Sequence, residues 1–67
     1  MKKYFDKSGI EIKVGQTITG LYPTGDPSGT VVEDLTTGEL YVEDSDGDWI
    51  TIESILENGC YVISDAP

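Results

Sequence analysis

Short apolar stretches separated by polar residues and glycines run along this 67-residue chain, which favours strands joined by turns. The segment 10–14 reads IEIKV, and its strict alternation is typical of a strand with one buried face. The next segment, 16–22, is predicted to be extended and holds Ile18 and Leu21. Two prolines and two glycines then mark the segment 23–29 as a loop.

Two hairpins are predicted in the middle of the chain. Residues 30–35 pair with residues 39–44 across a turn in which Gly38 suits a left-handed position. The second of these strands then pairs with residues 49–53 across the turn 45–48. The Asp-Gly pair at the centre of that turn is among the strongest short-range hairpin signals, because both residue types tolerate positive φ.

A single helical turn is predicted after the hairpins. The segment Ser54–Glu57 fits a capping box, in which the serine hydroxyl accepts from the glutamate amide and the glutamate carboxylate accepts from the serine amide. The Asn-Gly pair that follows ends the turn, because Gly59 tolerates a left-handed backbone. Residues 60–63 form the last predicted strand.

This order of strand, long loop, two hairpins, helical turn and final strand matches a small five-stranded barrel of the Src-homology-3-like type. We therefore predict an all-β protein with one domain, 1–67, in which 10–14 forms an N-terminal arm or an extra strand. The pattern leaves open whether Val62 or its neighbours Tyr61 and Ile63 face the core. The predicted core consists of Ile12, Val14, Ile18, Val32, Leu40, Val42, Ile50, Ile52, Ile55 and Val62.

Charge divides the chain into two unequal parts. Residues 1–13 carry all four lysines and two acids, whereas residues 14–67 carry the other 11 of the 13 acids and no base. That excess repels nucleic-acid phosphates, so direct binding to DNA or RNA is not expected. A globule of this length is about 28 Å across, and duplex DNA carries about 16 charges over that distance. The acidic part either mimics nucleic acid or serves solubility alone.

Composition disfavours catalysis and membrane insertion. The chain has no histidine, and its only cysteine, Cys60, lacks a cationic neighbour in sequence that would lower its pKa. We therefore expect a non-enzymatic protein without a cofactor, in which the thiol is buried. A lone cysteine forms no intramolecular disulfide, and the chain lacks the apolar run of a signal peptide or a membrane span. These features predict a cytoplasmic location and no membrane partner.

The aspartates at positions 44, 46 and 48 resemble the beginning of an EF-hand loop, because carboxylates stand at alternate positions. The sixth position of such a loop needs glycine and is Trp49 here, and the twelfth needs glutamate and is Ile55. A solvated hairpin tip therefore fits the segment better. We predict no specific metal site, and weak calcium binding stays an alternative.

The segment Asp6–Ile18 reads DKSGIEIKVGQTI and resembles the signature of small phage proteins of the YopX-like group, in which an aspartate and a glycine precede a Glu-Ile pair and a further glycine. The stretches 29–33, 39–42 and 62–63 look like barrel strands that follow in that group. The resemblance implies a small intracellular β-barrel from a phage or another mobile element. It brings no catalytic residues to this chain.

Acidic and aromatic residues together predict a protein-binding surface, because tryptophan anchors many interfaces and aromatic rings attract cations. The leading hypothesis is a phage-encoded inhibitor, monomeric or homodimeric, that occupies a basic, nucleic-acid-binding surface of a host protein. The alternative is a peptide-binding or assembly module that uses an aromatic groove and a sheet edge. The predicted binding residues are Tyr22, Glu39, Tyr41, Glu43, Asp44, Asp46, Asp48 and Trp49.

Overall fold

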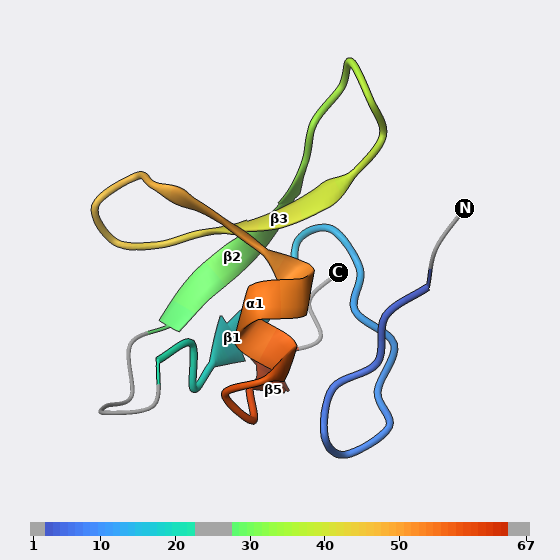
Figure 1. Ribbon diagram of the computed structural model, residues 1–67, viewed down its shortest axis with the longest axis vertical. Helices are drawn as coiled ribbons and strands as arrows, with labels where there is room; N and C mark the ends of the chain where they lie inside the picture. The colour runs from blue at the N-terminus through green and yellow to red at the C-terminus, as the bar shows by residue number, and fades with distance from the viewer. Residues whose placement is uncertain (1–2, 23–27, 65–67) are drawn as a thin grey trace.

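The computed structural model describes residues 3–22 and 28–64. Over these residues the elements are β1 (Thr17–Thr19), β2 (Ser28–Glu33), β3 (Leu40–Glu43), β4 (Trp49–Thr51), α1 (Ile52–Leu56) and β5 (Tyr61–Ser64). The strands are antiparallel and form one open sheet in the order β4-β3-β2-β1-β5 (Figure 1). The all-β prediction is confirmed, with one short helix before the last strand. Within the described part of the chain, no helix is long and apolar enough to cross a membrane.

Both predicted hairpins are present. β2 pairs with β3 so that Thr30 lies opposite Glu43, and Gly38 in the connecting turn has a φ of 77°. β3 pairs with β4 across the second turn, where Gly47 has a φ of 84°. Only the glycine of this Asp-Gly pair uses that tolerance of positive φ, because among the residues that the structure describes only glycines adopt positive φ.

β2 begins at Ser28, inside the segment that was predicted to be a loop. Gly29 explains this early start, because it lies opposite Ile18 of β1 and closely against β3. A Cβ at position 29 would stand 2.6 Å from the carbonyl oxygen of Glu43, so only glycine lets the two strands approach this closely. The rest of the predicted loop, residues 23–27, lies outside the described residues.

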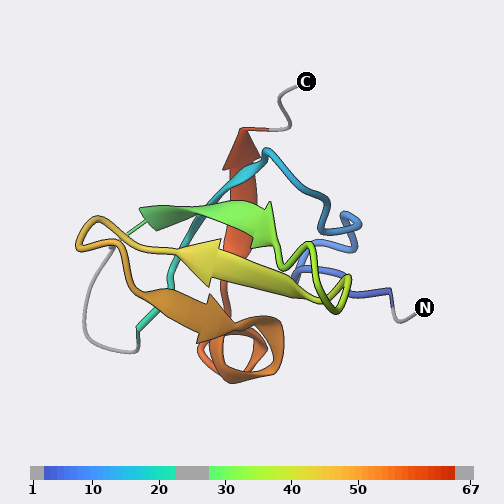
Figure 2. The same cartoon turned by 90° about the horizontal axis from the view of Figure 1, so that it is seen from above.

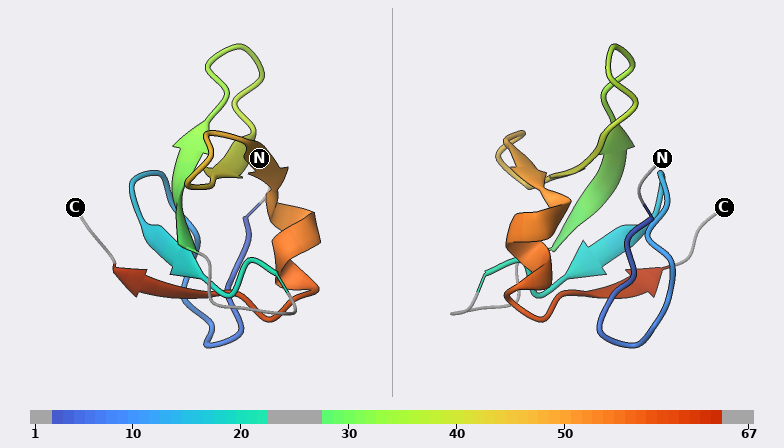
Figure 3. Two further views of the ribbon diagram at one scale, coloured as in Figure 1. Left: turned by 90° about the vertical axis from the view of Figure 1, so that its left-hand side faces the viewer. Right: turned by 45° about the vertical axis from the view of Figure 1, so that its right-hand side comes forward.

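β2 joins two parts of the sheet. Its beginning pairs with β1, which also pairs with β5, and its end pairs with β3. The hairpin strands β3 and β4 run at a steep angle to β5, and α1 connects the two parts (Figures 2 and 3). This strong bend of the sheet encloses the core.

The helix cap is Thr51 rather than Ser54, which corrects the predicted capping box. The Thr51 hydroxyl oxygen accepts from the Ser54 amide at 3.3 Å. β4 consequently ends at Thr51, and Glu53 lies in the first turn of α1 instead of in the strand. Burial is the physical reason, because helical spacing places both Ile52 and Ile55 in the core. The Asn-Gly pair ends the helix as predicted, with its glycine at a φ of 76°.

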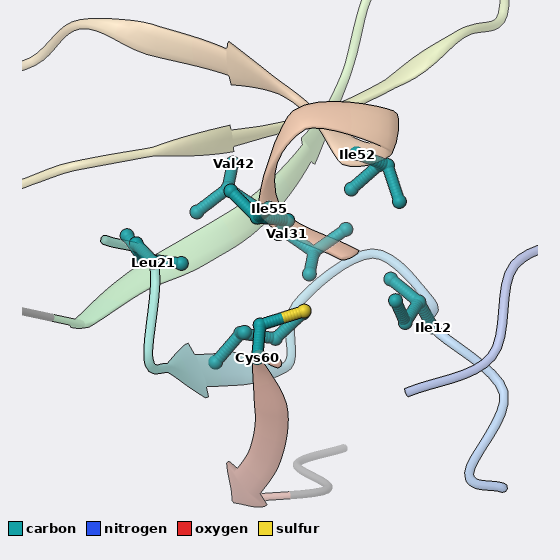
Figure 4. Close-up of a cluster of buried hydrophobic side chains, with 8 residues drawn as sticks. Ile12, Leu21, Val31, Val42, Ile52, Ile55 and Cys60 are labelled. Atoms are coloured by element: carbon teal, nitrogen blue, oxygen red, sulfur yellow. The ribbon is translucent and has the colours of Figure 1, made fainter. Parts of the chain in front are cut away.

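The core lies between the two parts of the sheet and α1 (Figure 4). Val62 packs against it, so Val62 rather than Tyr61 or Ile63 faces inward on β5. Two core predictions were wrong: Val14 is 53% exposed, and Val32 is only half-buried because the neighbouring valine takes the inner face of β2. Over the described residues the buried hydrophobic side chains are Ile12, Ile18, Leu21, Val31, Val42, Ile52, Ile55 and Cys60.

The N-terminal arm, residues 3–14, forms an irregular loop in place of the extra strand that was one of the two predictions for residues 10–14. The Ile12 amide donates to the Tyr4 carbonyl at 2.8 Å, and Phe5 forms an isolated bridge with Glu11. The alternation in 10–14 misled the strand prediction, because only the central isoleucine of this segment is buried. Figure 3 shows the arm beside β5.

Asp6 fastens the arm to β5. Its side chain is 6% exposed, and one carboxylate oxygen accepts from the amides of Ser8 and Ile10 at 2.8 and 2.9 Å. The other oxygen accepts from the Val62 amide at 2.8 Å, and the next arm residue donates its amide to the Cys60 carbonyl. The arm therefore covers part of the β5 edge, which would otherwise present unpaired backbone groups.

Candidate binding surface

An aromatic pair stands on the outer face of the β3–β4 hairpin. Tyr41 lies opposite Thr51 and Glu43 lies opposite Trp49, so the two rings are diagonal neighbours on the face away from buried Val42. Their centroids are 5.4 Å apart, with an angle of 32° between the ring planes. Trp49 nevertheless remains 48% exposed, so the pair presents aromatic surface to solvent.

Carboxylates flank this pair. The Tyr41 hydroxyl donates to Glu39 Oε2 at 3.1 Å, and this hydrogen bond, together with the negative charge of Glu39, raises the pKa of Tyr41. Glu43 projects from the same face of β3, directly across from Trp49. We call these four residues, Glu39, Tyr41, Glu43 and Trp49, the aromatic face.

The turn between β3 and β4 carries three aspartates, Asp44, Asp46 and Asp48, which we call the acidic tip. Asp44 holds the turn together, because its Oδ1 accepts from the amides of Asp46 and Asp48, each at 2.9 Å. The Tyr22 hydroxyl donates to its Oδ2 at 3.3 Å. Burial, and then the charge of Asp44, raise the pKa of Tyr22.

The acidic tip brings one carboxylate oxygen from each aspartate within 4.8 Å of the others. A calcium ion takes about six to eight oxygen ligands. The Asp44 oxygens already accept hydrogen bonds that shape the turn, which accounts for Asp44 without an ion. The arrangement is that of a well-formed hairpin tip, and calcium binding stays an untested alternative.

The structure thus sorts seven of the eight predicted binding residues into two neighbouring groups on one hairpin. The aromatic face lies along β3 and β4, and the acidic tip lies at the turn that joins these strands. Tyr22, which follows β1, reaches the tip through its hydroxyl.

A groove that the sequence did not reveal lies between the N-terminal arm and the β2–β3 hairpin. Its volume is about 770 Å³. Tyr4 and Glu53 line it together, and the Tyr4 hydroxyl donates to Glu53 Oε2 at 2.9 Å. This hydrogen bond, followed by burial, raises the pKa of Tyr4. The two residues are 49 positions apart, so no local pattern could have paired them.

The groove draws its lining from three parts of the chain. The arm, the β2–β3 hairpin and the beginning of α1 each contribute, and Figure 1 shows the arm and the hairpin on the same side of the molecule. The lining residues are Lys3, Tyr4, Glu11, Ile12, Lys13, Val14, Glu33, Thr37, Gly38, Glu39, Leu40, Tyr41, Thr51 and Glu53.

Cys60 is a buried thiol, as predicted. Only 1% of it is exposed, and burial, together with the negative charge of Asp6, raises its pKa. A thiol of this kind is a poor nucleophile near neutral pH, because the thiolate is the reactive form.

Comparison with protein-family models, with curated proteins and with solved structures finds no match. The resemblance to the YopX-like group therefore stays a prediction from the sequence.

Proposed function

We propose that this protein is a non-enzymatic binding protein whose β3–β4 hairpin docks on a basic surface of a host protein. The observation that carries the proposal is the aromatic face, where the exposed Trp49 ring packs on Tyr41 beside Glu39 and Glu43. Interfaces often use a tryptophan or tyrosine as a central anchor. Carboxylates around aromatic rings favour arginine or lysine as the matching group.

The overall charge supports the same partner. Residues 14–67 carry 11 acids and no base, and the longest dimension of the molecule is 32 Å. Duplex DNA carries about 19 charges over that length, so the acidic residues provide a charge density of the same order. On this proposal the protein inhibits its host target by standing in for nucleic acid. It acts in the cytoplasm, and its origin in a phage is inferred from the resemblance of residues 6–18.

We also propose that the bent sheet is a Src-homology-3-like barrel. The strand order β4-β3-β2-β1-β5 supports this, as does the sharing of β2 between the two parts of the sheet. The short helix α1 also lies between β4 and β5, which is the position of the helical turn in the element order that predicted this barrel. In this arrangement the β3–β4 hairpin projects from the barrel, and Asp46 and Asp48 are exposed at its tip.

A peptide-binding or assembly module is the second candidate, and the aromatic pair is the observation that favours it. Such a module would also use a sheet edge, but the N-terminal arm already occupies part of the β5 edge. There Asp6 accepts from the Val62 amide, and Lys7 donates its amide to the Cys60 carbonyl. Addition of a strand at β5 would therefore have to displace the arm. The charge of the hairpin separates the two candidates, because binding through an aromatic groove depends little on the acidic tip.

The experiment is capture of host proteins on the immobilised chain, followed by elution with increasing salt. The test variant combines Glu43→Gln, Asp46→Asn and Asp48→Asn, and it keeps Asp44 because Asp44 shapes the turn. The control is Glu57→Gln, an exposed glutamate after α1. The proposal requires that the natural chain captures a host protein and releases it as the salt concentration rises. The test variant should fail to capture this protein, whereas the control variant should still capture it. Capture that neither salt nor the test variant weakens would contradict it.

A further inference from the structure

The groove between the N-terminal arm and the β2–β3 hairpin carries an excess of negative charge. Among the residues that the structure describes, four glutamates and two lysines line it, which leaves two negative charges uncompensated within this part of the lining. A cation is therefore attracted to the groove and an anion is repelled. The charged lining residues are Lys3, Glu11, Lys13, Glu33, Glu39 and Glu53.

Apolar surface lies among these charges. Ile12 is buried, Leu40 is half-buried and Val14 is exposed, and all three line the groove. Lysine and arginine cover apolar surface with their aliphatic stems while their charged ends stay with polar groups. A long cationic side chain therefore matches this lining better than an uncharged apolar side chain does.

Two tyrosine–glutamate pairs also face the groove. The Tyr4 hydroxyl donates to Glu53 at 2.9 Å, and the Tyr41 hydroxyl donates to Glu39 at 3.1 Å. Each pair combines an aromatic ring, whose face attracts cations, with a full negative charge. One pair links the arm to α1 and the other belongs to the β2–β3 hairpin, so both sides of the groove offer the same chemistry.

The arm side of the groove is built before any ligand arrives. The Asp6 carboxylate ties the arm to β5 through the Val62 amide, and the Ile12 amide donates to the Tyr4 carbonyl within the arm. The Gln16 side chain accepts from the Lys13 amide at 2.7 Å. A preformed wall reduces the ordering cost of binding.

We propose that this groove binds an arginine or lysine side chain from an extended basic segment of the partner. The inference rests on the proposed function, because it takes the partner to be a protein with a basic surface. It adds a second contact to the aromatic face, with which the groove shares Glu39 and Tyr41. Charge complementarity selects this occupant over an acidic or a neutral apolar segment.

The test is a titration of the full, isotope-labelled chain with the blocked peptide acetyl-Ala-Arg-Ala-Arg-Ala-amide, followed by the amide chemical shifts. We expect saturable shifts at Lys13, Gly38, Leu40 and Glu53. The same peptide with citrulline in place of arginine keeps the shape and loses the charge. It should bind at least about threefold more weakly.

Two variants should change the affinity for the arginine peptide in opposite directions. Glu33→Gln removes a negative charge from the groove and should weaken binding of the arginine peptide about two- to fivefold. Lys13→Gln removes a competing positive charge and should strengthen binding by about the same factor. Glu57→Gln lies outside the groove lining and should change nothing. General damage to the fold would not strengthen binding. The two variants together therefore distinguish an electrostatic effect on binding from a loss of stability.

Three results would overturn the inference: no saturable shift, equal affinity for the arginine and citrulline peptides, or shifts confined to residues 43–49. The last result would leave the proposed function standing, because it would place the cation on the acidic tip and on the part of the aromatic face that Glu43 and Trp49 form. Conversely, saturable groove binding together with salt-insensitive capture of host protein would remove the proposed function and leave a cation-binding groove.

Discussion

Replacing Asp6 with alanine removes a carboxylate that accepts from the amides of Ser8, Ile10 and Val62. The first two amides belong to the arm's own turn, within four residues of Asp6, whereas the Val62 amide lies 56 positions away on β5. A hydrogen bond to a charged group contributes about 1.5–3 kcal/mol, and an unsatisfied buried donor carries a similar penalty. We expect the free energy of unfolding to fall by about 3 kcal/mol, mainly through the amide on β5.

This loss is large for so short a chain. Domains gain about 0.05–0.15 kcal/mol of stability per residue, which amounts to about 3–10 kcal/mol here. Each kcal/mol lowers the Tm of a domain of this size by about 4–8 °C, so Asp6→Ala should lower it by about 12–24 °C. Thermal and urea denaturation followed by circular dichroism measure both quantities.

The matched control is Asp34→Ala. Asp34 accepts from the amides of Thr36 and Thr37 in an exposed turn, so it repeats the local part of the Asp6 arrangement. We expect a loss of at most about 1 kcal/mol. If the two variants lose the same stability, the bond between Asp6 and β5 contributes nothing and the reasoning fails.

Acid provides a second check on Asp6. Burial acts to raise the pKa of this carboxyl, but hydrogen bonds from the amides of Val62, Ile10, Ser8 and Gly9 outweigh it, and the pKa lies below its ordinary value of 3.8. The carboxylate therefore stabilises the fold at pH values above the ordinary pKa, and this contribution is lost as the pH falls through the lowered pKa. The stability gap between the natural chain and Asp6→Ala should narrow below about pH 4, and a gap that widened there would refute the assignment.

Three further predictions concern the fold. Gly29→Ala should destabilise the chain by about 1–3 kcal/mol in urea denaturation, because its Cβ would meet the Glu43 carbonyl oxygen at 2.6 Å; a neutral effect would contradict the tight crossing of β2 and β3. Thr51→Ala should cost about 1 kcal/mol and Ser54→Ala less than about 0.5 kcal/mol, since Thr51 is the cap; the reverse order would restore the capping box at Ser54. Cys60 should react slowly with Ellman's reagent near neutral pH until denaturant exposes it, whereas rapid labelling of the native chain would show that the thiol is accessible.

Local patterns predicted the hairpins well, because turn chemistry acts over a few residues. Gly38 and Gly47 adopt the positive φ that their turns require. Local patterns failed where two adjacent residues were equally suited to face the core. Val31 and Val32 are identical in type, and only the register with β1 and β3 decides which one enters the core.

The candidate surface was predictable only in part, because local patterns predict contacts only between residues that are close in the sequence. The residues of the aromatic face and the acidic tip lie within the segment 39–49, so one hairpin brings them together. The groove depends instead on Tyr4 meeting Glu53, and its wall depends on Asp6 meeting Val62 across 56 positions. Such contacts follow from the whole fold, and single-sequence patterns carry no signal for them.

The salt dependence of binding to the captured host protein tests the central claim most directly. The claim is that a negative hairpin with an aromatic anchor docks on a basic surface, so charge must drive association. Raising the salt concentration from about 50 mM to about 500 mM shortens the Debye length, over which charges interact, about threefold. The dissociation constant of the natural chain should then rise by at least about tenfold, and the variant with Glu43→Gln, Asp46→Asn and Asp48→Asn should show a much shallower rise. A dissociation constant that is the same at both salt concentrations would contradict the account.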